Sequence, residues 1–600
     1  MKQFLITLAA IFVSVLIFIL FTSIIVFFSV RETPPKVDDG AMLVLNLNQP
    51  ISDRAQPGFD FSNVPDLLIS GAPSATFTLR ELMAVIDHAA EDDRISGIYL
   101  TGNVPTGGTF FSGSATLREL RESLERFRET GKKIYAYEEG YNMRSYYLAS
   151  LADSVFMHPF GTMGTRGYST TRMFYKGAME KFGFKMNLVS VGDYKSAPEV
   201  WYRTDMSAED QEQRLALMDG HFGQFSADVA ASRGVTVDAV HDLVENIDRF
   251  TDNQMLVEAG FIDKVTYIDE VFDFLREFTG EDDRTKPFRQ VSYSNYRENV
   301  KDKLFPKKGD QIALLYAEGA IVGGSGLPDV AGDRFGRTLR QIRTDDDIKA
   351  VVIRVNSPGG GVTPSEIILR EMRLLVEEKP VVVTMGNVAA SGGYWISSFA
   401  DHIYANPTTV TGSIGVFGMF PVLDELVGEY GFAYDGVKSH TFANLRTDSR
   451  SPTARETALI NAGINKVYDQ FLERVAEGRE LEMDAAHEVS QGRVWTGTAA
   501  LENGLIDELG GLNDALAKAA ELAELEEWQV KTYERAPGFQ ARLLQQFGTR
   551  SAEADIYTDS AHPSLADQYL TSLAQLMKFF SELDDPNGMY VRLAPGFYIE

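Results

Sequence analysis

The amino-acid sequence contains one pattern twice, and this internal repeat limits the possible folds more than any other feature. Residues 151–159 align with residues 399–407, and at the same offset 164–167 align with 412–415. Further blocks match in the same order at nearby offsets. Ordered similarity of this extent predicts two domains of one fold, each built from the same unit. A chain of 600 residues is long enough for two such domains.

Short apolar runs alternate with amphipathic stretches inside each copy. In the second copy, residues 350–355 are apolar apart from Arg354. Residues 363–377 then place apolar side chains at helical spacing, and residues 381–383 form another apolar run. The order strand, helix, strand predicts βαβ units around a parallel sheet. The fold class expected from the sequence is therefore α/β, as a tandem repeat.

The N-terminus predicts an uncleaved transmembrane helix. Residues 4–30 carry no charge, and the apolar run ends only at Arg31. This length can cross a hydrocarbon layer of about 30 Å with some tilt, and no small-residue cleavage site follows it. Lys2 precedes the segment and Arg31 and Lys36 follow it, so the positive-inside rule leaves the orientation open.

These observations divide the chain into four parts. The boundaries expected are 1–36 for a membrane anchor and linker, 37–300 for the first α/β repeat, 301–535 for the second, and 536–600 for a C-terminal extension.

Composition excludes several classes of function. The formal net charge of −28 disfavours binding to nucleic acid, which needs basic surface. The chain has no cysteine, which excludes disulfides, cysteine nucleophiles and zinc–thiolate sites. Its eight histidines show no metal-ligand spacing such as HExxH. We therefore expect neither a metal nor a cofactor.

Three glycine-rich loops of the second copy follow predicted strands, at residues 356–361, 387–394 and 411–415. Active sites of α/β folds collect at strand ends in such loops. Ser413 lies between Gly412 and Gly415, so its hydroxyl could be presented on a tight turn while nearby amides face an oxyanion. The spacing alone also fits an ordinary turn serine.

A serine nucleophile needs a base. The second copy offers His402 and His440, although no Ser-His-Asp signature is recognisable. Lysine can also act as the base where desolvation lowers its pKa. Lys195, in the first copy, is such a candidate, and by itself it would pass for a surface lysine.

The repeat register separates the two candidates. Ser413 aligns with Thr165 of the first copy, and Lys195 aligns with Ala443 of the second. Each copy thus carries one half of a Ser/Lys pair and lacks the other half.

Several motifs together resemble the long, tandem-repeat form of the signal peptide peptidase SppA (protease IV) family, peptidase family S49. The segments that carry the resemblance are Asn-Ser-Pro-Gly-Gly at 356–360, Ala-Ser-Gly-Gly-Tyr at 390–394, Thr-Gly-Ser-Ile-Gly at 411–415, Gly-Arg-Val-Trp-Thr-Gly at 492–497, Gly-Leu-Ile-Asp at 504–507 and Tyr-Lys-Ser at 194–196. The resemblance covers roughly residues 1–530.

The resemblance implies a fold of the ClpP/crotonase type and a catalytic dyad. Ser413 would be the nucleophile and Lys195 the general base and acid. Backbone amides of Gly359 or Gly360 would complete an oxyanion hole with those near Ser413. The residue that orients the lysine is open, with Ser196 and Ser391 as candidates.

The resemblance also implies a biological setting. The chain would be a serine endopeptidase of the bacterial cytoplasmic membrane, held by residues 4–30 as a single pass, with its catalytic body on the periplasmic side. Relatives assemble as a homotetramer and degrade cleaved signal peptides and other apolar peptides.

Three alternatives stay open. The same chemistry would serve a general quality-control protease of the envelope. A crotonase-like enzyme could use the same loops on an acyl-CoA thioester, although no basic site for the CoA phosphates is evident. A non-catalytic membrane scaffold could keep the fold without the activity.

Overall fold

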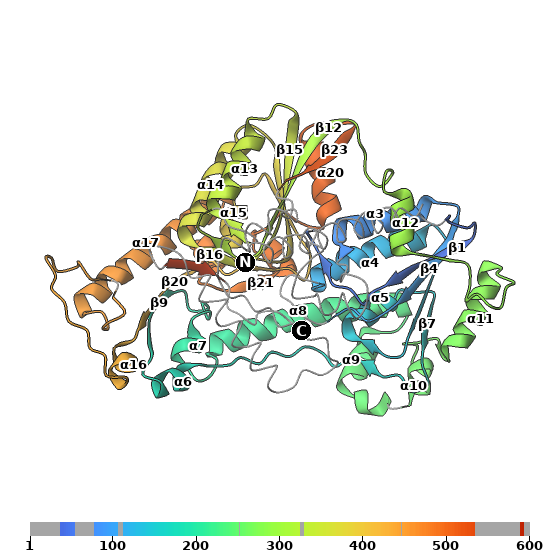
Figure 1. Cartoon of the computed structure of the whole chain (residues 1–600), viewed down its shortest axis with the longest axis horizontal. Helices are drawn as coiled ribbons and strands as arrows, with labels where there is room; N and C mark the ends of the chain where they lie inside the picture. Colours follow the sequence, from blue (N-terminus) through green and yellow to red (C-terminus); the bar gives the residue numbers. More distant parts are fainter. Residues whose placement is uncertain are drawn as a thin grey trace, which may run out of the picture.

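Two β-sheets form the centres of two α/β units in this computed structural model (Figure 1). The structure describes residues 36–54, 77–105, 112–250, 252–324, 329–445, 447–533 and 589–592. The first sheet consists, in spatial order, of β10 (Lys264–Val265), β7 (Ser154–Met157), β5 (Lys133–Glu138), β4 (Ile95–Thr101), β1 (Ala41–Asn46) and β11 (Gln290–Ser292). All its strand pairs are parallel.

The second sheet repeats this order. Its strands are β22 (Glu508–Leu509), β18 (His402–Ala405), β17 (Val381–Ala390), β15 (Ile348–Ser357), β12 (Asp310–Glu318) and β23 (Trp528–Thr532). The far end of β17 also pairs with β19 (Val410–Gly412), which continues to β21 (Val494–Thr496). In the first unit, β6 (Tyr141–Asn142) and β8 (Met163–Gly164) form the matching pair. The sequence repeat is therefore a repeat of one mixed α/β fold with parallel sheets, as predicted.

Helices flank the sheets, and most of them bury apolar side chains. In the first unit these are α3 (Leu79–Glu91), α4 (Ser114–Glu129), α5 (Met143–Ala149), α6 (Lys176–Lys181), α7 (Glu199–Tyr202), α8 (Ala208–Arg233), α9 (Val237–Glu245), α10 (Asn253–Glu258), α11 (Ile268–Thr279) and α12 (Tyr293–Val300), with a 3₁₀ turn at Ile247–Phe250. In the second unit they are α13 (Gly332–Arg343), α14 (Val362–Val376), α15 (Gly392–Ser397), α16 (Asp424–Glu429), α17 (Ala454–Gly478), α18 (Met483–Glu488), α19 (Gly497–Glu502) and α20 (Leu512–Leu522). The helix expected at 363–377 is α14.

A third sheet joins the two units. Its order is β14 (Val330–Ala331), β13 (Ile321–Val322), β16 (Gly359–Gly361), β24 (Met589–Arg592), β20 (Val416–Val422) and β9 (Lys185–Val191). Strand β9 belongs to the first half of the chain and pairs antiparallel with β20 along its whole length. We call residues 172–207, which include β9, the first arm, and residues 416–453 the second arm. The first arm thus crosses onto the second unit (Figure 1). A separate two-stranded pair, β2 (Ile51–Ser52) with β3 (Phe77–Thr78), lies in the first unit.

Long helix α8 supports this crossing. It begins at Ser207, whose side chain accepts a hydrogen bond from the Asp210 amide, and ends at Gly234 in a left-handed conformation. The helix contacts α5 and α9 of the first unit and β21 of the second. It therefore fixes the base of the first arm against both units.

A buried ion-pair network also joins the units. The Arg354 Nε lies 3.0 Å from Asp53 Oδ1, and its Nη2 lies 2.6 Å from Glu119 Oε1. All three side chains are almost fully buried. Glu119 also accepts hydrogen bonds from the Asn406 side chain and the Leu512 amide. The single charged residue in the apolar run 350–355 is thus explained, because it forms ion pairs with two buried carboxylates of the other unit.

Some sequence predictions fall outside the described residues. The anchor predicted at residues 4–30 is one of them, as is most of the extension predicted at 536–600. No helix in the described ranges has the length and apolar character needed to cross a membrane. The domain boundaries at 36, 300 and 535 stay predictions.

Loss of the Arg354 guanidinium should destabilise the ion-pair contact between the two units. The substitution Arg354→Ala leaves Asp53 and Glu119 buried without their partner, at a cost of about 3–5 kcal/mol. We expect a lower free energy of unfolding in chemical denaturation. The triple variant Arg354→Met, Asp53→Asn, Glu119→Gln removes the charges together and should lose less. An equal loss in both variants would show that packing, not charge, is the source.

Candidate active site

The structure brings Lys195 and Ser413 together, although they belong to different copies of the repeat. The Lys195 Nζ lies 3.0 Å from Ser413 Oγ and 2.8 Å from the Ser413 carbonyl oxygen. A third contact, of 2.8 Å, joins the Nζ to Ser391 Oγ. All three residues are buried. The serine and lysine predicted from the sequence thus lie within hydrogen-bond distance of each other.

The turn at Ser413 holds its backbone in an unusual conformation. Ser413 has a φ of 52°, in the left-handed region that favours glycine, and follows Gly412 with a φ of 79°. Such strain costs of order 1–3 kcal/mol and persists where the surroundings enforce it. The Ser413 amide donates a hydrogen bond of 2.7 Å to the Arg493 carbonyl oxygen, which anchors the turn. That amide is therefore already engaged and is not free to bind an oxyanion.

The loop that carries Lys195 is seated on the second unit by backbone contacts. Gly192 has a φ of 106°, and the Tyr194 amide donates to the Gln491 carbonyl oxygen. A Cβ on Gly492 would lie 2.6 Å from both the Lys195 amide nitrogen and the Lys195 Cβ. Only glycine at position 492 permits this approach, because such a distance is far below van der Waals contact. The glycine of the 492–497 motif thus admits the lysine.

A buried polar network lies behind the lysine. Ser196 Oγ donates to Asp210 Oδ1 at 2.6 Å, and Asp210 is paired with Arg172 and Arg214. Burial alone would raise the pKa of Asp210, but the two guanidinium groups hold it below its ordinary value. Of the two candidate orienting residues, Ser391 contacts the Lys195 amine, whereas the Ser196 side chain bonds to Asp210.

The surroundings of the Lys195 amine favour its neutral form. Desolvation by burial lowers the pKa of Lys195 well below its ordinary value. A neutral amine has two N–H donors and one lone pair. The three contacts of the Nζ can use these two donors and the lone pair. The N–H groups can donate to Ser391 Oγ and to the Ser413 carbonyl oxygen, while the lone pair faces the Ser413 hydroxyl. The arrangement can therefore take a proton from Ser413.

Gly359 and Gly360, the predicted oxyanion-hole residues, lie in buried strand β16. A Cβ placed on Gly392 would lie 3.1 Å from both the Gly359 Cα and the Gly360 amide nitrogen. Gly392 directly follows Ser391, so the two glycines adjoin the dyad. The Gly359 amide lies 3.2 Å from Ser357 Oγ. The oxyanion role of these amides stays a prediction.

The histidine alternatives lie elsewhere. His440 is exposed on the second arm, and its Nδ1 contacts the neighbouring Ser439 hydroxyl. His402 begins β18, and its Nε2 lies 3.4 Å from Glu508. The Ser413 hydroxyl instead contacts the Lys195 amine.

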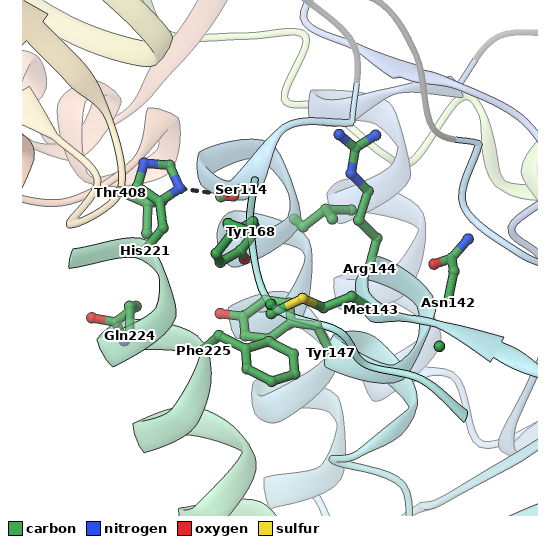
Figure 2. A pocket seen from close by; sticks show the side chains of 13 residues that line it. Ser114, Asn142, Met143, Arg144, Tyr147, Tyr168, His221, Gln224, Phe225 and Thr408 are labelled. Carbon is green, nitrogen blue, oxygen red and sulfur yellow. Dashed lines mark hydrogen bonds between the residues drawn. The ribbon is translucent and has the colours of Figure 1, made fainter. Parts of the chain in front are cut away.

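The counterpart of this site in the first unit is a pocket of about 190 Å³ (Figure 2). Gly164 and Gly167, which flank Thr165, contribute to its lining. Figure 2 shows His221 directed towards Ser114, at 3.2 Å, above Tyr168 and Phe225. Thr165 itself is fully buried, and no lysine lines the pocket. The first unit therefore keeps the fold of the site, but its pocket has no serine and lysine pair like Ser413 and Lys195.

Sequence reasoning missed the residues that seat the lysine loop. Asp210 and Gln213 lie on α8, and the Gln213 side chain donates to the Tyr194 carbonyl oxygen and accepts from the Val494 amide. Arg493 lies 4.7 Å from the Tyr194 ring centroid. Tyr194, Arg493 and Val494 belong to quoted motifs, whereas Asp210 and Gln213 do not, because their contacts depend on the crossing of the first arm.

Comparison with known proteins identifies the family of the chain. The chain is 34% identical over 470 residues to Protease 4 of Salmonella typhi, which covers 77% of this chain and 74% of that protein. It is 32% identical to Protease 4 of Haemophilus influenzae, over 82% and 80% of the two chains. It is 31% identical to the chloroplastic serine protease SPPA of Arabidopsis thaliana, over 82% and 70%. The family model of peptidase family S49 matches residues 126–280 and 373–526. The chain belongs to peptidase family S49 and is a serine protease.

Proposed function

We propose that this serine protease cleaves apolar peptides, including signal peptides released from preproteins, with Ser413 as nucleophile and Lys195 as general base. The observation that carries the proposal is the 3.0 Å contact between the Lys195 Nζ and Ser413 Oγ in a buried setting. A base whose nitrogen lies about 2.6–3.2 Å from the hydroxyl oxygen meets the geometric requirement for this chemistry.

The mechanism follows from the neutral amine. Lys195 takes the Ser413 proton as the Oγ attacks the scissile carbonyl carbon, and amides of the Gly359–Gly361 strand hold the oxyanion. The Lys195 ammonium then protonates the leaving amine as the C–N bond breaks, which leaves an acyl-enzyme. Lys195 next takes a proton from water, and the hydroxide attacks the acyl carbon. Breakdown of that intermediate releases the acid and returns the proton to Ser413.

The substrate class follows from the expected ClpP/crotonase-like fold and from the backbone at the site. Strands β16 and β20 border the dyad, and an extended peptide would pair with the main-chain groups that β24 contacts in this structure. The apolar core of a signal peptide, with small residues at its end, fits such recognition. Side-chain pockets would then add specificity.

We further infer an anchored ring assembly. The first arm docks on the second unit of its own chain, whereas the second arm exposes Tyr430, Phe432 and Val437, which are 75%, 70% and 104% exposed. Exposed apolar groups of this kind fit a contact with another chain. A head-to-tail contact of the second arm with the first unit of the next copy would close a ring, and we propose four copies. Residues 4–30 would hold this ring on the cytoplasmic membrane of a bacterium, with the body in the periplasm.

Removal of either dyad side chain should abolish hydrolysis of a fluorogenic apolar peptide by detergent-solubilised protein. Lys195→Met removes the base and should lower kcat by about 10²–10⁴-fold. Ser413→Ala removes the nucleophile and should lower kcat by up to about 10⁶-fold.

Matched controls are available in the same chain. Thr165→Ala changes the repeat counterpart of the serine, and Lys181→Ala removes an exposed lysine of the first arm. Both should keep wild-type kcat. Activity that survives Lys195→Met would contradict the assignment of the base, and peptide binding without turnover in wild type would indicate a scaffold.

The pH dependence of kcat/KM should report the depressed pKa of Lys195. The active form is the neutral amine, so activity rises as pH increases through this pKa. Because burial lowers the pKa, the rising limb should lie well below the ordinary lysine value of about 10.4. A limb near that value in the assembled enzyme would show that the amine is not desolvated during catalysis.

Membrane association and assembly can be measured on one preparation. The full chain should resist alkaline carbonate extraction from bacterial membranes, and deletion of residues 1–36 should release it. Light scattering of the released protein should give the mass of four chains. Full-length protein found in the soluble fraction, or a monomer mass, would refute the corresponding proposal.

A further inference from the structure

One buried side chain bonds to main-chain groups on both sides of the dyad. Gln213 lies on α8 and is fully buried. Its Nε2 donates to the Tyr194 carbonyl oxygen at 3.0 Å, and its Oε1 accepts from the Val494 amide at 3.2 Å. Tyr194 directly precedes Lys195 on the first arm, and Val494 belongs to β21 of the second unit. The Gln213 carboxamide thus connects the two units next to the dyad.

On the second unit, this connection continues to the nucleophile. The Val494 nitrogen and the Arg493 carbonyl group belong to one planar peptide group, whose N–H and C=O point in opposite directions. The N–H donates to Gln213, and the carbonyl oxygen accepts from the Ser413 amide at 2.7 Å. A single rigid plane therefore separates the Gln213 carboxamide from the backbone of Ser413.

On the first arm, the connection continues to the base. The Tyr194 carbonyl and the Lys195 nitrogen also form one peptide group, which is bonded directly to the Lys195 Cα. The Gln213 Nε2 additionally lies 3.2 Å from Ser196 Oγ, so this side chain contacts the residues on both sides of the lysine. Three planar amides thus form a head-to-tail chain of hydrogen bonds from Lys195 to Ser413.

A carboxamide has the chemistry that both ends of this bridge need. The Tyr194 carbonyl can only accept and the Val494 amide can only donate, so the side chain between them must offer one donor and one acceptor at its tip. A charged glutamate lacks the donor, and methionine has no donor and only a weak acceptor. The three amides are aligned in one direction, and hydrogen bonds in such a chain polarise and strengthen one another.

The helix that carries Gln213 is packed closely against the second unit. A Cβ on Gly220 would lie 2.8 Å from the Thr496 Cγ2, so α8 lies directly against β21. Strand β21 pairs antiparallel with β19, the strand that leads into the Ser413 turn. The bridge therefore connects two elements that are themselves held in place.

We propose that Gln213 is a positioning residue of the dyad, which sets the distance between the Lys195 amine and the Ser413 hydroxyl. The inference rests on the proposed function for the roles of base and nucleophile. The hydrogen bonds of the carboxamide go to main-chain groups and to the side chains of Ser196 and Asp210, so Gln213 acts through the backbone of the dyad. A displacement of about 1 Å between reacting groups can cost about 10²-fold in rate.

The substitution Gln213→Met in the full chain keeps the length of the side chain and removes the bridge. We expect kcat for a fluorogenic apolar peptide to fall about 10–100-fold, because the dyad loses its fixed distance. KM should stay within twofold of wild type, since the strands that border the dyad keep their contacts. A residue that only supported the fold would not separate the two parameters in this way.

The matched control is Gln224→Met, the same substitution on the same helix. The Gln224 carboxamide donates to Asp228 within the first unit, so its loss removes a side-chain hydrogen bond of α8 without touching the bridge. This control should keep the wild-type kcat and KM.

A second variant covers the case in which Gln213→Met fails to fold. Gln213→Ser leaves space for water, which can satisfy the Tyr194 carbonyl and the Val494 amide without fixing the distance between them. It should lower kcat as Gln213→Met does. Hydrogen exchange of the Val494 amide measures the bridge without turnover, and it should be slow in wild type and in Gln224→Met but faster in both Gln213 variants.

Labelling of Ser413 by a fluorophosphonate separates this inference from the proposed substrate class. The reagent needs an activated serine but no bound peptide strand, so its second-order rate constant should fall together with kcat in the Gln213 variants. A wild type that is labelled at Ser413 but cleaves no apolar peptide would refute the proposed substrate class, and the labelling rates would still test the positioning role.

Two results would overturn the positioning role. The first is a folded Gln213 variant whose kcat and labelling rate stay within twofold of wild type, or whose Val494 amide exchanges as slowly as in wild type. The second is a loss of kcat that Gln224→Met shares, because the effect would then come from the stability of α8 rather than from the bridge.

Discussion

The crossing of the first arm onto the second unit is the constraint on which the candidate site depends. Strand β9 pairs with β20 from Lys185–Val422 to Val191–Val416, and the chain then turns at Gly192 to place Lys195 beside Ser413. The two residues lie far apart in sequence, yet the entropic cost of closing a loop grows only logarithmically with its length. Backbone pairing over a full strand, together with the docking of α8, can offset this loss of conformational entropy.

A buried lysine works as a base only if nothing nearby stabilises its charge. Desolvation is the cause that lowers the pKa of Lys195, and a carboxylate in contact would raise it again. The nearby Asp210 is held by Arg172 and Arg214 and reaches the lysine loop through Ser196, so its charge is already compensated. The protein thus gains a polar support behind the loop without giving the amine a counter-ion.

The sequence predicted the α/β fold class and singled out the two residues that meet at the candidate site, but it did not predict the contacts that bring them together. The repeat and the strand–helix periodicity predicted parallel sheets, and the predicted helix at 363–377 corresponds to α14. The pairing of Lys195 with Ser413 came from family motifs and from the register with Thr165 and Ala443. No local sequence pattern predicted that Arg354 would pair with Asp53 of the other unit, because the pairing of charges distant in sequence depends on the tertiary structure. The position of β24 depends on the tertiary structure in the same way.

The asymmetry of the repeats has a consequence for any assembly of this chain. The first unit presents Thr165 in place of the serine, fully buried next to a pocket of aromatic and polar side chains. The second arm carries Ala443 where the first arm carries Lys195. Docking of a second arm on the first unit of a neighbouring copy would therefore place Ala443, and not a lysine, at the position that corresponds to Lys195. Among the described residues, the Ser/Lys pair therefore forms within one chain, and the aligned positions Thr165 and Ala443 do not repeat it.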